Sequence, residues 1–195
     1  MLNKNNFFKN FTLNLNKTKK AYQSLKTDLK NFEIPELNSY DKSYDLDFSS
    51  LTIKKFSKYN NIVIIGMGGS ILGAKSIYSY FKKKIKKKIF FFDNLDENLY
   101  LNFKKLKNFK SSCFIVVSKS GNTIETISNF DIILSKLNLK NRLVIITEIK
   151  NNGLMRIANK FNAEIIEHKN YIGGRYSVLS ESGMFPAALM GLKIE

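Results

Sequence analysis

Several residue types are scarce in this 195-residue chain, and each scarcity excludes a class of protein. Cys113 is the single cysteine, which excludes a disulfide framework and a cysteine-based metal cluster. No apolar run approaches the roughly 20 residues that span a bilayer. The first residues, Met1 to Asn6, lack the apolar core of a signal peptide. We therefore expect a soluble, cytoplasmic protein that has no metal site and no membrane partner.

Acidic residues are also few, with 16 Asp and Glu against 32 Lys and Arg and a formal charge of +16. A basic balance can indicate a nucleic-acid or acidic membrane partner. However, the lysines are spread along the chain, and their densest run, residues 82–88, lies between a predicted helix and a predicted strand. No helix-turn-helix, zinc or RNA-binding motif accompanies them. We favour a solvated surface and expect no nucleic-acid partner, although the positive field would attract small anions.

The first 50 residues are predicted to form a separate, mainly helical segment that ends in a linker. Apolar residues at spacings of three and four, from Tyr22 to Phe32, predict a helix over residues 17–32, and Pro35 ends the pattern. Residues 38–50 are polar and are predicted to wrap the following domain. The main domain is expected over residues 51–195.

Buried strands alternate with helices through this main domain. Continuous apolar runs predict strands, and amphipathic patterns between them predict helices. The expected strands are residues 61–66, 89–93, 113–117, 143–147 and 164–167, and the expected helices are 71–82, 97–106, 127–137, 153–161 and 179–189. This alternation predicts an α/β fold, a doubly wound parallel sheet in a flavodoxin-like three-layer sandwich.

Hydroxyl side chains gather in residues 117–125, where the third strand meets its helix. Ser118, Ser120 and Thr123 offer hydroxyl donors, and Gly121 lets the backbone approach a ligand closely. The unpaired amides and partial positive charge of a helix N-terminus bind anions, so this loop can hold a phosphate. The alternative is an ordinary capped helix, in which Asn122 and Glu125 form a capping box. The loop does not have the spacing of a P-loop.

Two further turns follow predicted strands at the same edge of the sheet. The glycine turn at residues 66–70 ends in Ser70, but Ile71 stands where a dinucleotide-binding fingerprint needs glycine. Close helix–strand packing is one explanation of this turn, and an anion contact through Ser70 and the Gly69 amide is the other, which we favour. Ligands bind beyond the carboxyl ends of parallel strands, where these turns would meet.

The turn after the fifth strand places an arginine behind two glycines. Arg175 carries a permanent charge and planar donors that suit a phosphate or a developing oxyanion, although a plain surface arginine is the alternative. His168, the only histidine, lies beside Lys169 at the end of the strand. We expect His168 to lie at the surface without a catalytic role.

Taken together, these turns resemble the phosphoglucose isomerase family, whose first sugar-isomerase (SIS) domain carries the same segments in the same order. The matching stretches are residues 65–73, 93–96, 117–126 and 173–180, and the G-G-R-[FY]-S pattern in the last is the most specific. The serine-rich loop alone is shared by many SIS domains, including binding modules. The resemblance covers residues 61–195 well and the N-terminal segment weakly.

The resemblance implies a site for glucose 6-phosphate and fructose 6-phosphate. Arg175 would stabilise the cis-enediolate between the two sugars, and no cofactor is implied. The residues implied in substrate binding are Gly69, Ser70, Ser118, Lys119 (through its amide), Ser120, Thr123 and Gly174.

The resemblance also implies parts that this chain does not contain. The family's proton-transferring glutamate and its ring-opening histidine and lysine come later than residue 195, and neither Glu181 nor His168 matches them. We therefore expect the N-terminal part of an isomerase, without the second SIS domain and inactive alone, whose full-length form is a homodimer. A non-catalytic SIS module that binds a sugar phosphate is the alternative.

Overall fold

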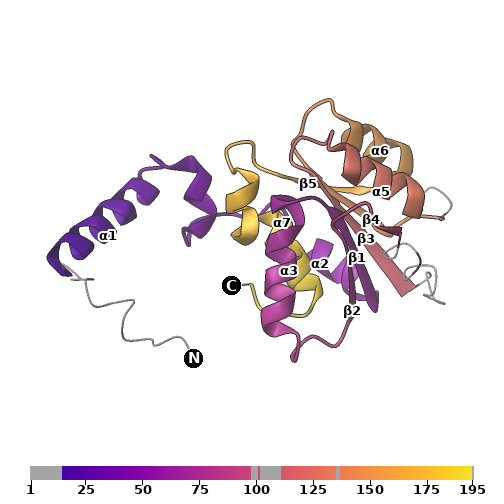
Figure 1. The fold of residues 1–195 in the computed structure, drawn as a ribbon, viewed down its shortest axis with the longest axis horizontal. Helices are drawn as coiled ribbons and strands as arrows, with labels where there is room; N and C mark the ends of the chain where they lie inside the picture. The colour runs from indigo at the N-terminus through magenta and orange to yellow at the C-terminus, as the bar shows by residue number, and fades with distance from the viewer. Residues whose placement is uncertain (1–14, 98–100, 102–110, 135–136, 195) are drawn as a thin grey trace.

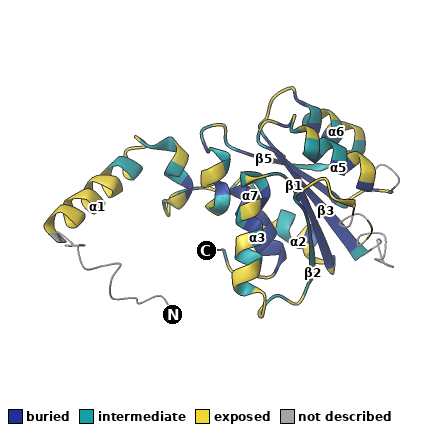
Figure 2. Cartoon of the chain, in the orientation of Figure 1, coloured by how far each residue is buried: buried dark blue, intermediate teal, exposed yellow. Residues whose placement is uncertain are grey.

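A single five-stranded parallel sheet forms the centre of the protein in the computed structural model, which describes residues 15–97, 101, 111–134 and 137–194 (Figure 1). The five expected strands are all present, with shifts of one residue at most. They are β1 (Asn61–Gly66), β2 (Lys88–Phe92), β3 (Ser112–Val117), β4 (Leu143–Thr147) and β5 (Glu164–Glu167). Figure 2 shows the sheet as the most buried part of the molecule, and every residue of β1, β3 and β4 is buried.

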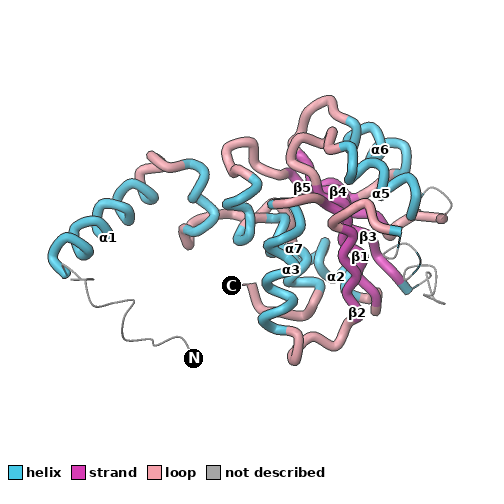
Figure 3. The backbone as a smooth tube through the Cα atoms, viewed as in Figure 1, coloured by secondary structure: helices cyan, strands magenta, loops and turns pink. Residues whose placement is uncertain are grey.

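The strand order β2-β1-β3-β4-β5 fixes where a ligand can bind. From β1 the chain first adds β2 on one side, and it then returns to add β3 on the other side. All four strand pairs are parallel. The loops after β1 and β3 therefore leave the same edge of the sheet and diverge to opposite faces (Figure 3). A switch point of this kind leaves a crevice at the carboxyl ends of the strands, where ligands of doubly wound sheets bind.

Helices cover both faces of the sheet, which confirms the predicted doubly wound α/β sandwich (Figure 1). One core joins the sheet to α2 (Ser50–Ser57), α3 (Gly69–Phe81) and α7 (Glu181–Leu189). The other core joins it to α5 (Ile124–Leu134) and α6 (Gly153–Phe161). Successive side chains of a strand point to opposite faces. Accordingly, Ile62 and Ile64 enter the first core, and Val63 and Ile65 enter the second.

Three predicted helices differ from the structure in their bounds, and a fourth cannot be compared. The helix expected over residues 127–137 is α5, which begins three residues earlier, at Ile124. The helix after β1 begins at Gly69, two residues earlier than expected, because the glycine turn itself enters the first helical turn. The helix expected over residues 179–189 is α7, which begins at Glu181, and Leu179 instead ends the preceding 3-10 helix η3 (Gly174–Leu179). The helix expected over residues 97–106 falls almost entirely outside the described residues.

The N-terminal segment contains α1 (Leu15–Lys30), close to the predicted helix, and η1 (Pro35–Tyr40), which Pro35 begins. Figure 2 shows α1 projecting from the body and largely exposed. Tyr22 and Leu25, on its predicted apolar face, are 59% and 39% exposed. The division of the chain at residue 50 stays a prediction. Among the described helices, none combines the length and the apolar character that crossing a membrane requires.

Candidate functional site

The hydroxyl loop, residues 117–125, brings three side-chain hydroxyls together at the carboxyl edge of β3. The Oγ of Ser118 lies 2.8 Å from Thr123 Oγ1 and 3.5 Å from Ser120 Oγ. The backbone amide of Gly121 donates to Ser118 Oγ (3.2 Å), and that of Asn122 donates to Ser120 Oγ (3.3 Å). Ser118 is buried, whereas Ser120 is exposed. The loop thus gathers hydroxyl groups that range from buried to exposed, and such a cluster of donors suits the several oxygens of a phosphate.

The far side of the hydroxyl loop is held by the first turn of α6. The amide of Gly153 donates to Asn122 Oδ1 (2.8 Å), and the amide of Leu154 donates to the Gly121 carbonyl (2.9 Å). The capping-box alternative for Asn122 is therefore wrong, because its side-chain oxygen accepts from α6 and not from its own helix. Gly121 has φ +69°, a left-handed conformation that favours glycine.

The turn after β1 lies directly beside this loop. Gly66 pairs with Val117 across the β1–β3 ladder, one residue before Ser118. The Cβ of Ser70 packs over Gly66, where an added methyl group would lie 3.4 Å from it. Ser70 and Ser118 therefore follow neighbouring strands at the β1/β3 switch point, as the sequence predicted for their common edge.

The third turn meets the first through a backbone contact. Gly69 and Gly174 pack so closely that a Cβ on Gly69 would overlap the Gly174 peptide. The buried Ser177 hydroxyl lies 2.8 Å from the carbonyl of Gly174 and 3.3 Å from that of Gly69, and so ties the two turns together. Arg175, next along η3, is exposed and forms no ion pair within the described part of the chain. The structure thus brings the backbone beside Arg175 to the Ser70 turn and leaves the guanidinium open to solvent.

Lys119 is anchored to the end of β4. Its carbonyl accepts from the amide of Glu148 (3.2 Å) and from Thr147 Oγ1 (3.4 Å). Its ammonium lies 3.8 Å from Glu148 Oε1. The backbone contacts fix the orientation of the loop's peptide groups, and the ion pair draws the lysine side chain toward β4.

The expectation that His168 lies at the surface is wrong. Its amide donates to the Thr147 carbonyl (2.9 Å), which continues the β4–β5 pairing by one residue and carries the ring inside. The side chain is fully buried, and Nε2 has no hydrogen-bond partner in the described structure. Burial is the main cause that lowers the pKa of His168, and nearby Lys119 adds to it, so the ring is neutral near pH 7.

Two buried polar residues near the site were not predicted. Glu181, in the first turn of α7, accepts from the Tyr44 hydroxyl (2.8 and 2.9 Å) and from the Asp47 amide (3.2 Å). Burial raises the pKa of this carboxyl, while its hydrogen bonds lower it in part. Asn152, the N-cap of α6, is 2% exposed. Partners of Glu181 lie more than 130 positions away in the sequence, so no local pattern indicated them.

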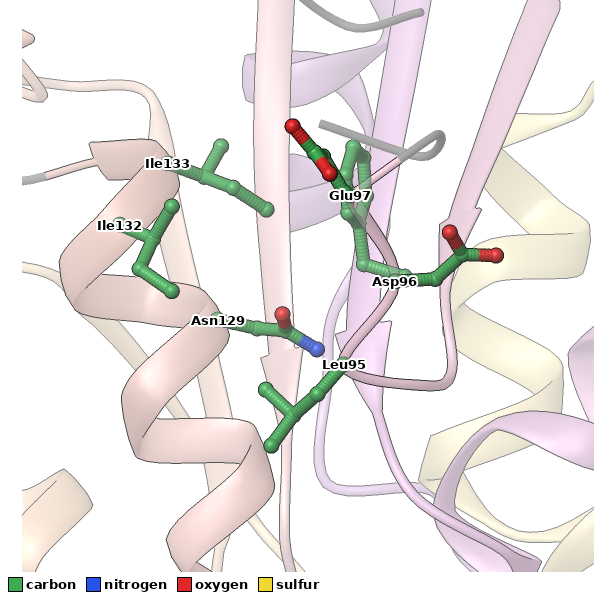
Figure 4. A pocket seen from close by; sticks show the side chains of 7 residues that line it. Leu95, Asp96, Glu97, Asn129, Ile132 and Ile133 are labelled. Atoms are coloured by element: carbon green, nitrogen blue, oxygen red, sulfur yellow. The ribbon is translucent and has the colours of Figure 1, made fainter. Parts of the chain in front are cut away.

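A separate apolar hollow lies between the loop after β2 and α5 (Figure 4). Ile132 and Asn129 line it from α5 and Leu95 lines it from the loop after β2, and Asn129 Nδ2 donates to the carbonyl of Asn94 (3.1 Å). Its lining includes no residue of the hydroxyl loop. The described ranges hold no group of three or more His, Cys, Asp or Glu that could bind a metal ion.

Comparison with known proteins identifies close relatives. The family model described as phosphoglucose isomerase matches residues 40–194. A glucose-6-phosphate isomerase of Methanocaldococcus jannaschii is 38% identical over 160 residues, which cover 80% of this chain and 37% of that protein. The enzyme of the same name from Mycoplasmoides gallisepticum is 30% identical, with 92% of this chain and 47% of that protein covered. This chain thus spans less than half the length of either relative.

Solved structures share the fold. A hypothetical protein from Thermus thermophilus matches with a TM-score of 0.66 at 22% identity, covering 90% of this chain and 47% of that chain. A glucose-6-phosphate isomerase from Chlamydia trachomatis matches with a TM-score of 0.59 at 24% identity, covering 76% and 32%. At these identities the likeness concerns the fold alone.

Proposed function

Because the chain belongs to the phosphoglucose isomerase family, we propose that it forms the phosphate-binding part of a glucose-6-phosphate isomerase. The substrates are glucose 6-phosphate and fructose 6-phosphate, interconverted through a cis-enediolate. The observation that carries the proposal is the cluster of Ser118, Ser120 and Thr123 hydroxyls at the β1/β3 switch point. A site of hydroxyl and amide donors suits the phosphate end of the sugar.

The proposed binding residues act on the phosphate group through different donors. Ser118, Ser120 and Thr123 donate from their hydroxyls, and Lys119 donates from its amide. Ser70 and the Gly69 amide approach from the neighbouring turn, and Gly174 lies against that turn. The partial positive charge at the N-termini of α3 and α5 adds to the attraction of a dianion.

The proposed catalytic residue is Arg175. Proton transfer between C1 and C2 of the sugar places negative charge on two oxygens in the enediolate. A permanent cation with planar donors stabilises that charge more than it stabilises the neutral ground state, and such differential stabilisation accelerates the reaction. The exposed guanidinium, unpaired in the described structure, supports this role.

The remaining chemistry needs groups outside this chain. Enolisation requires a positioned base, and we propose that a part of the protein beyond residue 195 supplies it, since the chain spans 37% of a family member's length. The proposal further includes a cytoplasmic location, a homodimer as the full-length form, and no cofactor.

Two measurements test this function. Fructose 6-phosphate is titrated calorimetrically into the chain, and conversion to glucose 6-phosphate is followed in a dehydrogenase-coupled assay of the chain and of a longer protein containing it. Binding by the chain together with turnover by the longer protein supports the proposal. Binding without turnover in either supports the non-catalytic sugar-phosphate module. Absence of binding contradicts both.

A further inference from the structure

Asn152 lies directly behind the hydroxyl loop and contacts three segments at once. Its carboxamide is 2% exposed and packs against Gly121, because a Cβ added to Gly121 would overlap that carboxamide. The Oδ1 atom accepts from the amide of Met155 (2.8 Å), which caps α6. The Nδ2 atom donates to Thr147 Oγ1 (3.2 Å) and to the Glu148 carbonyl (3.1 Å). Both nitrogen and oxygen of this buried carboxamide thereby have hydrogen-bond partners, and both Nδ2 hydrogens are used.

Two chains of contacts lead from Asn152 to the loop's ligand-facing groups. In the first, the carboxamide supports Gly121, whose amide donates to the Oγ of Ser118 (3.2 Å). In the second, Nδ2 donates to Thr147 Oγ1, so that the hydroxyl hydrogen of Thr147 is directed to the Lys119 carbonyl (3.4 Å). The second chain therefore orients the peptide group between Lys119 and Ser120.

We propose that Asn152 is a positioning residue that holds the hydroxyl loop in its anion-binding conformation. This inference rests on the proposed function of that loop. A buried carboxamide with satisfied hydrogen bonds is rigid, and preorganised donors bind an anion without a cost for ordering them. Asn152 itself does not touch the ligand, because the loop lies between them.

The alternative role of Asn152 is that of a helix cap only, and a matched pair of variants separates the two. Asn152→Ser keeps a hydroxyl that can accept at an N-cap, but it loses the carboxamide that supports Gly121 and donates to Thr147. Ser49→Ala removes an equivalent cap from α2, which packs in the core on the other face of the sheet from α6 and where Ser49 Oγ accepts from the Thr52 amide (3.2 Å). If Asn152 acts only as a helix cap, then Ser49→Ala, which loses its cap, should affect the affinity and the Gly121 exchange rate at least as much as Asn152→Ser, which keeps a capping hydroxyl.

The decisive experiment measures glucose 6-phosphate affinity and backbone hydrogen exchange in the chain and its variants. We expect Asn152→Ser and Asn152→Ala to raise the dissociation constant about tenfold, as for the loss of one well-ordered contact. The Gly121 amide, which donates to the carbonyl of Ser118 (3.1 Å) and to its Oγ, should exchange faster in both. In Ser49→Ala, the affinity and the Gly121 exchange rate should equal those of the wild type.

Each result decides between the roles. Wild-type affinity in Asn152→Ser, or an unchanged Gly121 exchange rate in both Asn152 variants, overturns the positioning role. If the wild-type chain itself does not bind glucose 6-phosphate, the proposed function fails, and the exchange rate of Gly121 alone then decides whether Asn152 orders the loop.

Discussion

At the scale of single residues, the hydroxyl loop contains two kinds of side chain. Some can contact a ligand directly, and others hold the loop in its shape. Ser118 is buried and already bonded to Thr123, whereas Ser120 is exposed and has its Oγ 3.5 Å from Ser118. The Ser120 hydroxyl accepts one loop contact, from the Asn122 amide (3.3 Å), but that contact is exposed, so we expect this hydroxyl to act mainly on a ligand. A buried one also holds the loop, so its removal mixes the two effects.

The first prediction therefore concerns Ser120. Ser120→Ala should weaken binding of glucose 6-phosphate by roughly 1.5–3 kcal/mol, the range for a hydrogen bond to a charged group. The melting temperature should change little, because the lost hydroxyl is exposed. Calorimetric titration and thermal unfolding of the same samples check both parts.

Arg175→Ala in a catalytically complete protein should instead lower turnover, and unchanged kinetics in both variants would refute the two assignments.

The second prediction concerns the buried ring of His168. Its pKa is lowered from the ordinary value of 6.5, so folding favours the neutral form. Well above pH 6.5 the ring is neutral in both the folded and the unfolded chain, so both states bind the same number of protons at His168. As the pH falls below it, the unfolded chain takes up a proton that the folded chain does not, and the free energy of unfolding decreases. The decrease is at most about 1.4 kcal/mol for each pH unit.

Thermal unfolding of the wild type and of His168→Gln from about pH 8 to about pH 5 checks this. The stability of the wild type relative to the variant should decrease toward acid pH, because glutamine does not titrate. The carboxyl of Glu181, whose pKa is raised, is present in both proteins and cancels in the difference. A difference that stays constant with pH would show that His168 does not control the acid-side loss.

At the scale of the elements, strands and the turns after them could be predicted, but contacts between distant segments could not. Apolar runs such as residues 61–66 specify a strand locally, and a parallel arrangement then places the following turns at one edge. The burial of His168 depends on pairing with Thr147, and that of Glu181 depends on Tyr44, 137 positions away. Glutamate is a residue type that usually lies at the surface, and histidine is intermediate, so the local sequence around His168 and Glu181 gives no sign of their burial.

The close packing of α3 against η3 gives a prediction at this scale. A Cβ on Gly69 would overlap the Gly174 peptide, whereas a Cβ on Gly68 meets no atom within 4 Å. Gly69→Ala should therefore separate the two turns and lower both stability, by about 1–3 kcal/mol for overpacking, and affinity for the sugar phosphate. Gly68→Ala is strained only through its φ of +54° and should keep the contact between the turns. Equal affinity in Gly69→Ala and the wild type would contradict a site shared by the turns.

At the scale of the whole molecule, much of the positive charge, +16 in total, lies away from the candidate site. The densest run, residues 82–88, follows the C-terminal end of α3, while the N-terminus of the same helix lies at the site. Thirteen residues of helix separate the two by about 20 Å at a rise of about 1.5 Å per residue. Lys87 Nζ donates to the Ser57 carbonyl (2.8 Å) at the end of α2, which places this charge at the edge opposite to the hydroxyl loop.

This separation predicts which charges attract the substrate. The Debye length is about 10 Å at an ionic strength of about 0.1 M, so lysines about 20 Å away are screened, whereas Arg175 beside the site is not. The affinity for glucose 6-phosphate should fall as salt rises, and the slope should be nearly the same in a triple variant with Lys82, Lys83 and Lys84 changed to Gln. Arg175→Gln, which removes one charge instead of three, should flatten the slope more. Titrations at several salt concentrations measure these slopes, and a larger effect of the triple variant would show that net charge, and not the local charge at the carboxyl edge of the sheet, governs binding.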